Sequence, residues 1–97
     1  MRYGIVLAPQ AVQDLRRLRA HARAEVKDAI ETHLRYEPTK VSRSRIKRLK
    51  GLDQPQFRLR VDEVRVFYDV VATEVQILAI VNKPDVAAWL AKVGKQS

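Results

Sequence analysis

The stretch from residue 47 to residue 71, KRLKGLDQPQFRLRVDEVRVFYDVV, decides the fold. After a basic run and a glycine, it contains two segments, 57–61 and 64–71, in which side-chain character alternates from one residue to the next. Period-two alternation of β-branched and aromatic residues is typical of half-buried strands. Asp62 and Glu63 stand between the two segments with no spare residue. We therefore predict a tight β-hairpin with these two residues as its loop.

This loop fixes the register of the hairpin. The predicted cross-strand pairs are Val61–Val64, Arg60–Arg65, Leu59–Val66, Arg58–Phe67 and Phe57–Tyr68. A shift by one residue would turn arginines into the core, so the pattern itself selects this register. Arg58, Arg60 and Arg65 then share one face with Phe67. Directly opposed like charges are unfavourable, so the cluster indicates either an anionic partner or merely a solvated face of a basic protein.

The length and composition indicate a single globular domain. A chain of 97 residues can bury one modest core, and we expect one domain spanning residues 1–97. The sequence has no cysteine, which excludes disulfides and thiolate metal sites. His21 and His33 are the only imidazoles, twelve residues apart, so neither a metal site nor a cofactor is expected.

The chain is strongly basic. Its 19 lysines and arginines exceed its 11 acidic residues by eight, and the sequence pI is about 10.3. Such an excess favours nucleic acid, an anionic membrane surface or an acidic protein as a partner. Between residues 43 and 65 there are eight basic residues and three acidic ones, so charge gathers around the hairpin. No apolar run reaches the roughly 18 residues of a membrane span, and the N-terminal apolar stretch is too short for a signal peptide. We expect a cytoplasmic location without membrane contact.

The remaining elements follow from periodicity and from proline and glycine positions. We predict a strand at 2–7, helices at about 9–20 and 22–36, a basic loop at 38–55, strands at 57–61, 64–71 and 75–82, and a final helix from Pro84 to Gly94. This β-α-α-β-β-β-α order predicts an α+β fold in which a two-helix hairpin packs on one face of an antiparallel sheet. In the strand at 75–82 we expect Leu78 and Ile80 to share the open face with Phe67. Exposed apolar residues rimmed by charge would mark a partner-binding surface.

Four motifs in this order resemble the RelE/ParE superfamily of bacterial toxin–antitoxin toxins over nearly the whole chain. They are LKG at 49–51, FRLRV at 57–61, VRVFYDV at 64–70 and ILAIV at 77–81. For RelE-type members the resemblance implies a ribosome-dependent endoribonuclease, an mRNA interferase that needs no metal and uses the ribose 2′-OH as nucleophile. It also implies a cognate antitoxin as partner, and binding of operator DNA only through the toxin–antitoxin complex. ParE relatives share the fold but inhibit gyrase, so a non-nucleolytic, protein-binding toxin is the alternative.

The resemblance also suggests which residues carry the chemistry. The paired basic positions of the family fall at Arg58 and Arg60, the second-strand arginine at Arg65, and the basic position after the last strand at Lys83, or at Pro84 if the register moves by one. The family's C-terminal tyrosine has no clear counterpart, because the region holds Ala87, Trp89 and Leu90.

The chemistry of these side chains limits their roles. Guanidinium groups of Arg60 and Arg65 could stabilise charge on a phosphoryl transition state. Arginine is effectively always protonated, so Arg58 and Arg60 are poor general bases, whereas Lys83 could act as acid or base. The expected RNA- and ribosome-binding residues are Arg43, Arg45, Lys47, Arg48, Lys50 and Phe67. Phe67 could stack on a base or pack beneath the C-terminal segment.

Overall fold

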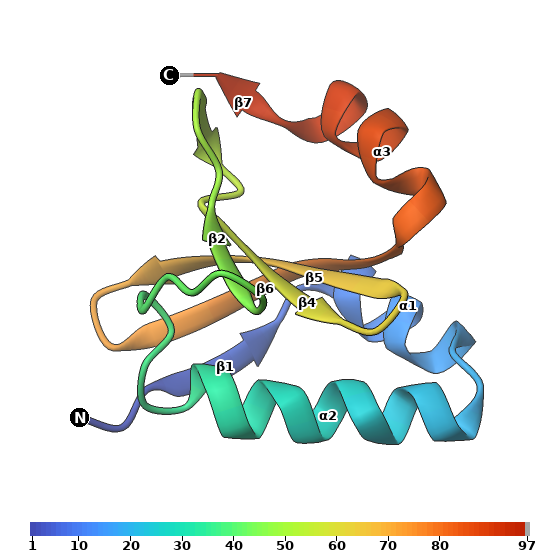
Figure 1. Ribbon diagram of the computed structural model, residues 1–97, viewed down its shortest axis with the longest axis horizontal. Coiled ribbons are helices and arrows are strands. Elements are labelled where there is room, and N and C mark those ends of the chain that lie inside the picture. The colour runs from blue at the N-terminus through green and yellow to red at the C-terminus, as the bar shows by residue number, and fades with distance from the viewer. Residues whose placement is uncertain (97) are drawn as a thin grey trace.

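The computed structural model describes residues 1–96 and confirms the α+β class (Figure 1). Its elements are β1 (Gly4–Leu7), α1 (Pro9–Arg17), α2 (Ala20–Leu34), β2 (Ile46–Arg48), β3 (Leu52–Gln54), β4 (Phe57–Val61), β5 (Val64–Val71), β6 (Glu74–Asn82), a 3-10 turn (Lys83–Asp85), α3 (Val86–Val93) and β7 (Lys95–Gln96). The predicted loop at 38–55 therefore contains two strands of three residues each. Strands this short carry no readable periodicity, and they form here because β4 and β7 offer them partners.

Five strands form the main sheet in the order β1-β6-β5-β4-β2. All neighbours run antiparallel except β1, which pairs in parallel with β6. The five cross-strand pairs predicted for the β4–β5 hairpin are all present. Asp62, the first loop residue, has φ = 53°, a left-handed conformation that aspartate tolerates better than most residues.

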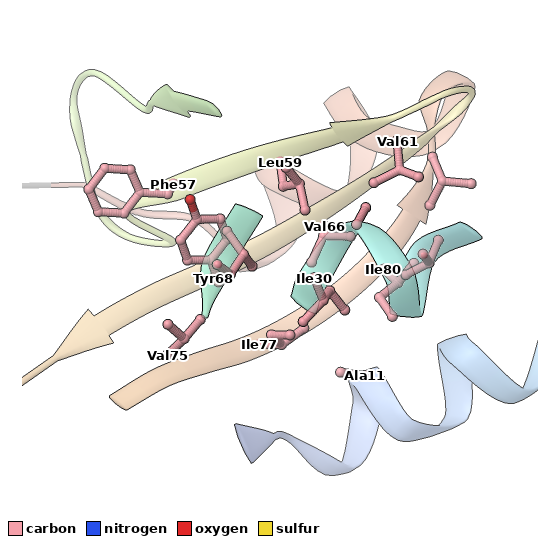
Figure 2. Close-up of a cluster of buried hydrophobic side chains, with 14 of the residues drawn as sticks. Ala11, Ile30, Phe57, Leu59, Val61, Val66, Tyr68, Val75, Ile77 and Ile80 are labelled. Carbon is pink, nitrogen blue, oxygen red and sulfur yellow. The ribbon is translucent and has the colours of Figure 1, made fainter. Parts of the chain in front are cut away.

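The main core lies between one face of this sheet and the helices α1 and α2, as predicted. Helix α2 contributes Val26, Ala29, Ile30 and Leu34, and α1 contributes Ala11. Figure 2 shows these helices beside the inward-facing sheet side chains, which include Leu59, Val66, Tyr68 and Ile77. The Tyr68 hydroxyl donates a 2.6 Å hydrogen bond to the Pro38 carbonyl, and its burial raises the pKa of the phenol well above its ordinary value.

A β-bulge in β6 overturns one expectation about the sheet faces. Phe67 pairs with Ala79, but the next residue of β5, Tyr68, pairs with Ile77, so Leu78 is an extra, unpaired residue. Beyond Leu78 the alternation of β6 is inverted. Ile80 is therefore buried in the main core rather than on the open face, while Leu78 is only half-buried. The Ile80 amide donates to Asp14 of α1, because β1 pairs with β6 only as far as Ile77.

Helix α3 covers part of the opposite sheet face. Its residues Val86, Trp89 and Leu90 pack on a small cluster formed by Phe67, Ala79 and Val81. Gly94 ends α3, as predicted, and leads into β7, which pairs with β3. A β-carbon on Gly94 would lie 2.6 Å from the Leu90 carbonyl oxygen, so the last turn of α3 leaves no room for a side chain at this position.

Candidate anion-binding site

Two rows of side chains run across the sheet face opposite the main core. Strand pairing places Lys47, Arg58, Phe67 and Ala79 side by side in the first row, and Arg60, Arg65 and Val81 in the second. Arg45 joins the second row from the segment before β2, because the Arg60 amide donates to the Arg45 carbonyl. Apart from Arg65 on β5, the basic residues thus occupy the β2–β4 half of the face and the apolar ones the β5–β6 half.

Helix α3 covers the apolar half of the face. Phe67 is fully buried, and its ring stacks on Trp89 with a centroid separation of 4.7 Å. The alternative in which Phe67 packs beneath the C-terminal segment is thus the observed arrangement, and stacking of Phe67 on a base would require α3 to leave. The expectation that Phe67, Leu78 and Ile80 form an exposed apolar surface is therefore wrong. Helix α3 covers Phe67, and the bulge at Leu78 turns Ile80 into the main core.

The basic half remains accessible around Arg60 and Lys47, which are both exposed. Arg58 is half-buried beside them, and its Nε is buried without a hydrogen-bond partner in residues 1–96. Desolvation lowers the pKa of Arg58, with smaller contributions from the neighbouring charges of Arg65 and Arg60. Within that range no salt bridge reaches any of the three arginines. The site therefore holds positive charge that the described part of the chain leaves uncompensated.

Arg65 differs from the other two arginines because it is only 7% exposed. Its NH1 group donates to the carbonyls of Asp62, at 2.7 Å, and of Val64, at 3.1 Å. The guanidinium therefore holds the hairpin loop, a role that the alternation pattern did not reveal.

Asp69, the carboxylate of β5 on this face, is also held by structural hydrogen bonds. Asp69 is buried and accepts hydrogen bonds from the Gln54 side chain and from the Gln56 amide, at 2.7 and 2.8 Å. The Gln56 side chain in turn accepts from the Val70 amide. Asp69 therefore shapes the turn between β3 and β4 and does not neutralise the arginines.

The other predicted site residues are spread around the cluster. Arg45 NH1 donates to the Arg60 carbonyl at 3.4 Å, while Arg48 donates to the Gln56 carbonyl and lies 5.3 Å from the centre of the Phe57 ring. Arg43 and Lys50 are exposed on the connecting segments. The sequence grouped Lys47 with these loop residues, and the structure instead places it on β2, directly opposite Arg58. Its only sequence signal was its position next to Ile46, an apolar residue that proves to be buried.

Lys83 lies at the far end of the face. It follows β6, and its amide donates to the Glu63 carbonyl at 2.8 Å, so its backbone is fixed beside the hairpin loop. Ala87, Trp89 and Leu90, which occupy the region of the family's tyrosine, carry no hydroxyl group. Ala87 is exposed, and Trp89 and Leu90 pack on the Phe67 cluster.

A polar cavity of about 510 Å³ opens between α2 and the exposed end of β4. Arg45 and Arg60 line one side, whereas Glu25, Asp28 and His33 come from α2. The mixture of charges distinguishes this cavity from the basic half of the sheet face. In residues 1–96, no group of three or more histidine, aspartate or glutamate side chains is placed to hold a metal ion, and no helix is long and apolar enough to cross a membrane.

Comparisons with known proteins agree with this geometry. The family model described as the ParE toxin of the type II toxin–antitoxin system parDE matches residues 5–83. No curated protein matches the chain. Among solved structures, the RelBE2 toxin–antitoxin complex from Mycobacterium tuberculosis has a chain that is 25% identical, with a TM-score of 0.69 over 84% of this chain and 99% of that one.

Two further structures share the fold at lower identity. The archaeal RelE–RelB complex from Pyrococcus horikoshii gives 23% identity and a TM-score of 0.70 over 86% of this chain and 97% of that chain. A double mutant of E. coli toxin RelE in the free state gives 19% identity and a TM-score of 0.68, with 94% and 93% covered. With the match spanning β1 to the end of β6, including the whole basic face, the chain belongs to the ParE toxin family of type II toxin–antitoxin systems, within the RelE/ParE superfamily.

Proposed function

We propose that this toxin inhibits translation by cleaving mRNA on the ribosome, with Arg58, Arg60 and Arg65 around the scissile phosphate and Lys83 at the hairpin-loop end of the same substrate path. The observation that carries the proposal is the uncompensated charge of Arg58 and Arg60 on an open sheet face. Fixed cations of this kind stabilise the charge that develops on the non-bridging oxygens during phosphoryl transfer. The reaction needs no metal, because the ribose 2′-oxygen attacks the adjacent phosphorus and the 5′-oxygen leaves.

The arginines have separate tasks in this proposal. Arg60 is exposed and contacts the phosphate directly, and Arg58 contributes its partly desolvated guanidinium. Arg65 adds positive charge from beneath while it holds the hairpin loop. The exposed Arg43, Arg45, Lys47, Arg48 and Lys50 bind ribosomal RNA and position the toxin.

The decisive experiment is addition of the purified toxin to ribosomes programmed with a defined mRNA. We expect fragments that appear only when ribosomes are present and that end in a 2′,3′-cyclic phosphate. Intact mRNA together with unimpaired translation would overturn the proposal. Folding of each preparation is checked by thermal melting.

A second candidate function is inhibition of a protein target such as gyrase, without any nuclease activity. The buried Phe67–Trp89 stack and the lack of a tyrosine in the sequence after β6 favour it, since both remove groups that the nuclease would use. The family model's ParE description agrees with this candidate. Loss of gyrase supercoiling activity at toxin concentrations that leave mRNA intact would establish it in place of the first.

We further propose that a cognate antitoxin binds this toxin, by analogy with the RelBE2 and RelE–RelB complexes. Acidic residues of the antitoxin would match the basic half of the sheet face, and the complex, not the free toxin, would bind operator DNA. Co-expression with its cognate antitoxin should give a stable complex in which growth arrest is lost. A charge-reversed Arg60→Glu toxin should bind that partner more weakly.

A further inference from the structure

The first step concerns where Lys47 lies. Ile46 pairs with Leu59, and both are buried in the main core. Because side chains alternate along a strand, the next pair, Lys47 and Arg58, faces the opposite side. Directly opposed residues of antiparallel strands have β-carbons roughly 4.5–5.5 Å apart. The Lys47 side chain therefore leaves the backbone next to that of Arg58, on the open half of the face.

The second step concerns which chemistry the neighbours of Lys47 can supply. Arg58 and Arg60 face it from β4, Arg65 from β5 and Arg45 from the segment before β2, whereas Asp69, the carboxylate of β5, is occupied by Gln54 and Gln56. Guanidinium groups do not release a proton under ordinary conditions, but an amine can. In the two rows that pairing defines, Lys47 is thus the side chain able to exchange a proton.

The third step compares Lys47 with Lys83. Phe67 and Ala79 share the row of Lys47 and Arg58, and Lys83 lies four residues beyond Ala79. At about 3.3 Å per residue this places Lys83 roughly 13 Å farther along the sheet. A proton acceptor must come within hydrogen-bond reach of its proton. Lys47 lies directly opposite Arg58 and one strand from Arg60, so it is placed beside a phosphate held by these two arginines. Lys83 follows β6, two strands away from β4, and would need the substrate to extend to the hairpin loop.

We infer that Lys47, beyond the RNA contact proposed for it above, is the proton-transfer residue of this site, an inference that rests on the proposed mRNA cleavage. The neutral Lys47 Nζ accepts the proton of the ribose 2′-OH as the 2′-oxygen forms its bond to phosphorus. The bond between phosphorus and the 5′-oxygen breaks, and that oxygen takes a proton from water. The products are a 2′,3′-cyclic phosphate and a 5′-hydroxyl, and Lys47 afterwards returns its proton to solvent.

Single-turnover cleavage of mRNA on programmed ribosomes at saturating toxin tests the inference. Lys47→Arg keeps the positive charge but cannot exchange the proton, and we expect it to lower the rate by about 10²–10⁴-fold, as does loss of a general base. Lys47→Ala should lower the cleavage rate by the same factor, and small primary amines in the buffer should restore part of the rate of this variant. We expect the wild-type rate to rise with pH and this rise to be lost in both variants.

The matched control is Lys27→Arg on the exposed surface of α2, which should cleave like the wild type. Wild-type cleavage and an unchanged pH profile in Lys47→Arg would show that only charge is needed at this position, and would overturn the inference. Failure of the wild-type toxin itself to cleave would instead reject the proposed function, and the inference with it. Thermal melting of each variant separates loss of proton transfer from loss of fold.

Discussion

Side chains of the same type on the basic face have different surroundings, and this decides what their removal does. Arg60 is exposed, whereas Arg65, directly opposite, is buried and donates to the carbonyls of the hairpin loop. The alternating pattern placed both correctly on one face. It could not distinguish them, because burial of Arg65 depends on the loop conformation at Asp62 and on the neighbouring strand β6.

We expect Arg60→Ala to lower mRNA cleavage by about 10²–10³-fold, as loss of one fixed charge donor does, and to change the unfolding free energy by less than about 0.5 kcal/mol. Arg65→Ala should instead destabilise the fold by about 1–3 kcal/mol, because hydrogen bonds from a buried charged donor are lost. Chemical denaturation and single-turnover cleavage of both variants provide the comparison. Equal stabilities of the two variants would contradict the structural role of Arg65.

Tyr68 provides a prediction about pH, since burial raises the pKa of its phenol above the ordinary value. The unfolded chain releases this proton near pH 10, while the folded chain retains it to higher pH. The contribution of Tyr68 to stability is therefore complete below about pH 10 and is lost as the pH rises further. Tyr68→Phe, which removes the bond to the Pro38 carbonyl, should cost about 1 kcal/mol at neutral pH. The difference from wild type should shrink above pH 10, and denaturation at a series of pH values measures it; a constant difference would refute this account.

The strands and helices show how far periodicity alone can predict the fold. The β4–β5 register followed from the alternation because one slip would have buried arginines. The faces of β6 did not follow, because the bulge at Leu78 inverts the alternation within a strand that is apolar on both faces. Likewise, β2 was missed, and with it the position of Lys47, because three residues show no period and the strand exists only through pairing with β4.

Helix α3 is attached less firmly than the rest, since none of its residues is fully buried and Trp89 provides its one aromatic stack on Phe67. We expect Trp89→Ala to release α3 locally. Hydrogen exchange of the Leu90–Val93 amides should accelerate, while exchange in β5 stays slow. By contrast, Leu59→Ala in the main core should cost about 2–5 kcal/mol and accelerate exchange throughout. Uniform acceleration in Trp89→Ala would show that α3 and the sheet unfold as one unit.

Across the whole molecule, positive charge has two functions, which different residues carry. The net charge of +8 acts over long distances and attracts polyanions, whereas the few arginines on the open sheet face act on one phosphate. Arg43 is exposed on the segment before β2 and belongs to the first group. Contacts of this kind position a partner and weaken as salt displaces them, but they do not take part in the reaction.

Arg43→Ala should therefore weaken binding to programmed ribosomes and make it less dependent on salt. The slope of log affinity against log salt concentration should decrease by roughly 0.7–0.9, the value for one phosphate contact. The cleavage rate at saturating toxin should remain that of the wild type, unlike the rate of Arg60→Ala. Lys27→Ala, an equal loss of charge on α2, is the control and should change neither quantity, because α2 lies on the core side of the sheet. If Arg43→Ala lowered the saturated rate as much as Arg60→Ala, the division between positioning and reacting charges would be wrong.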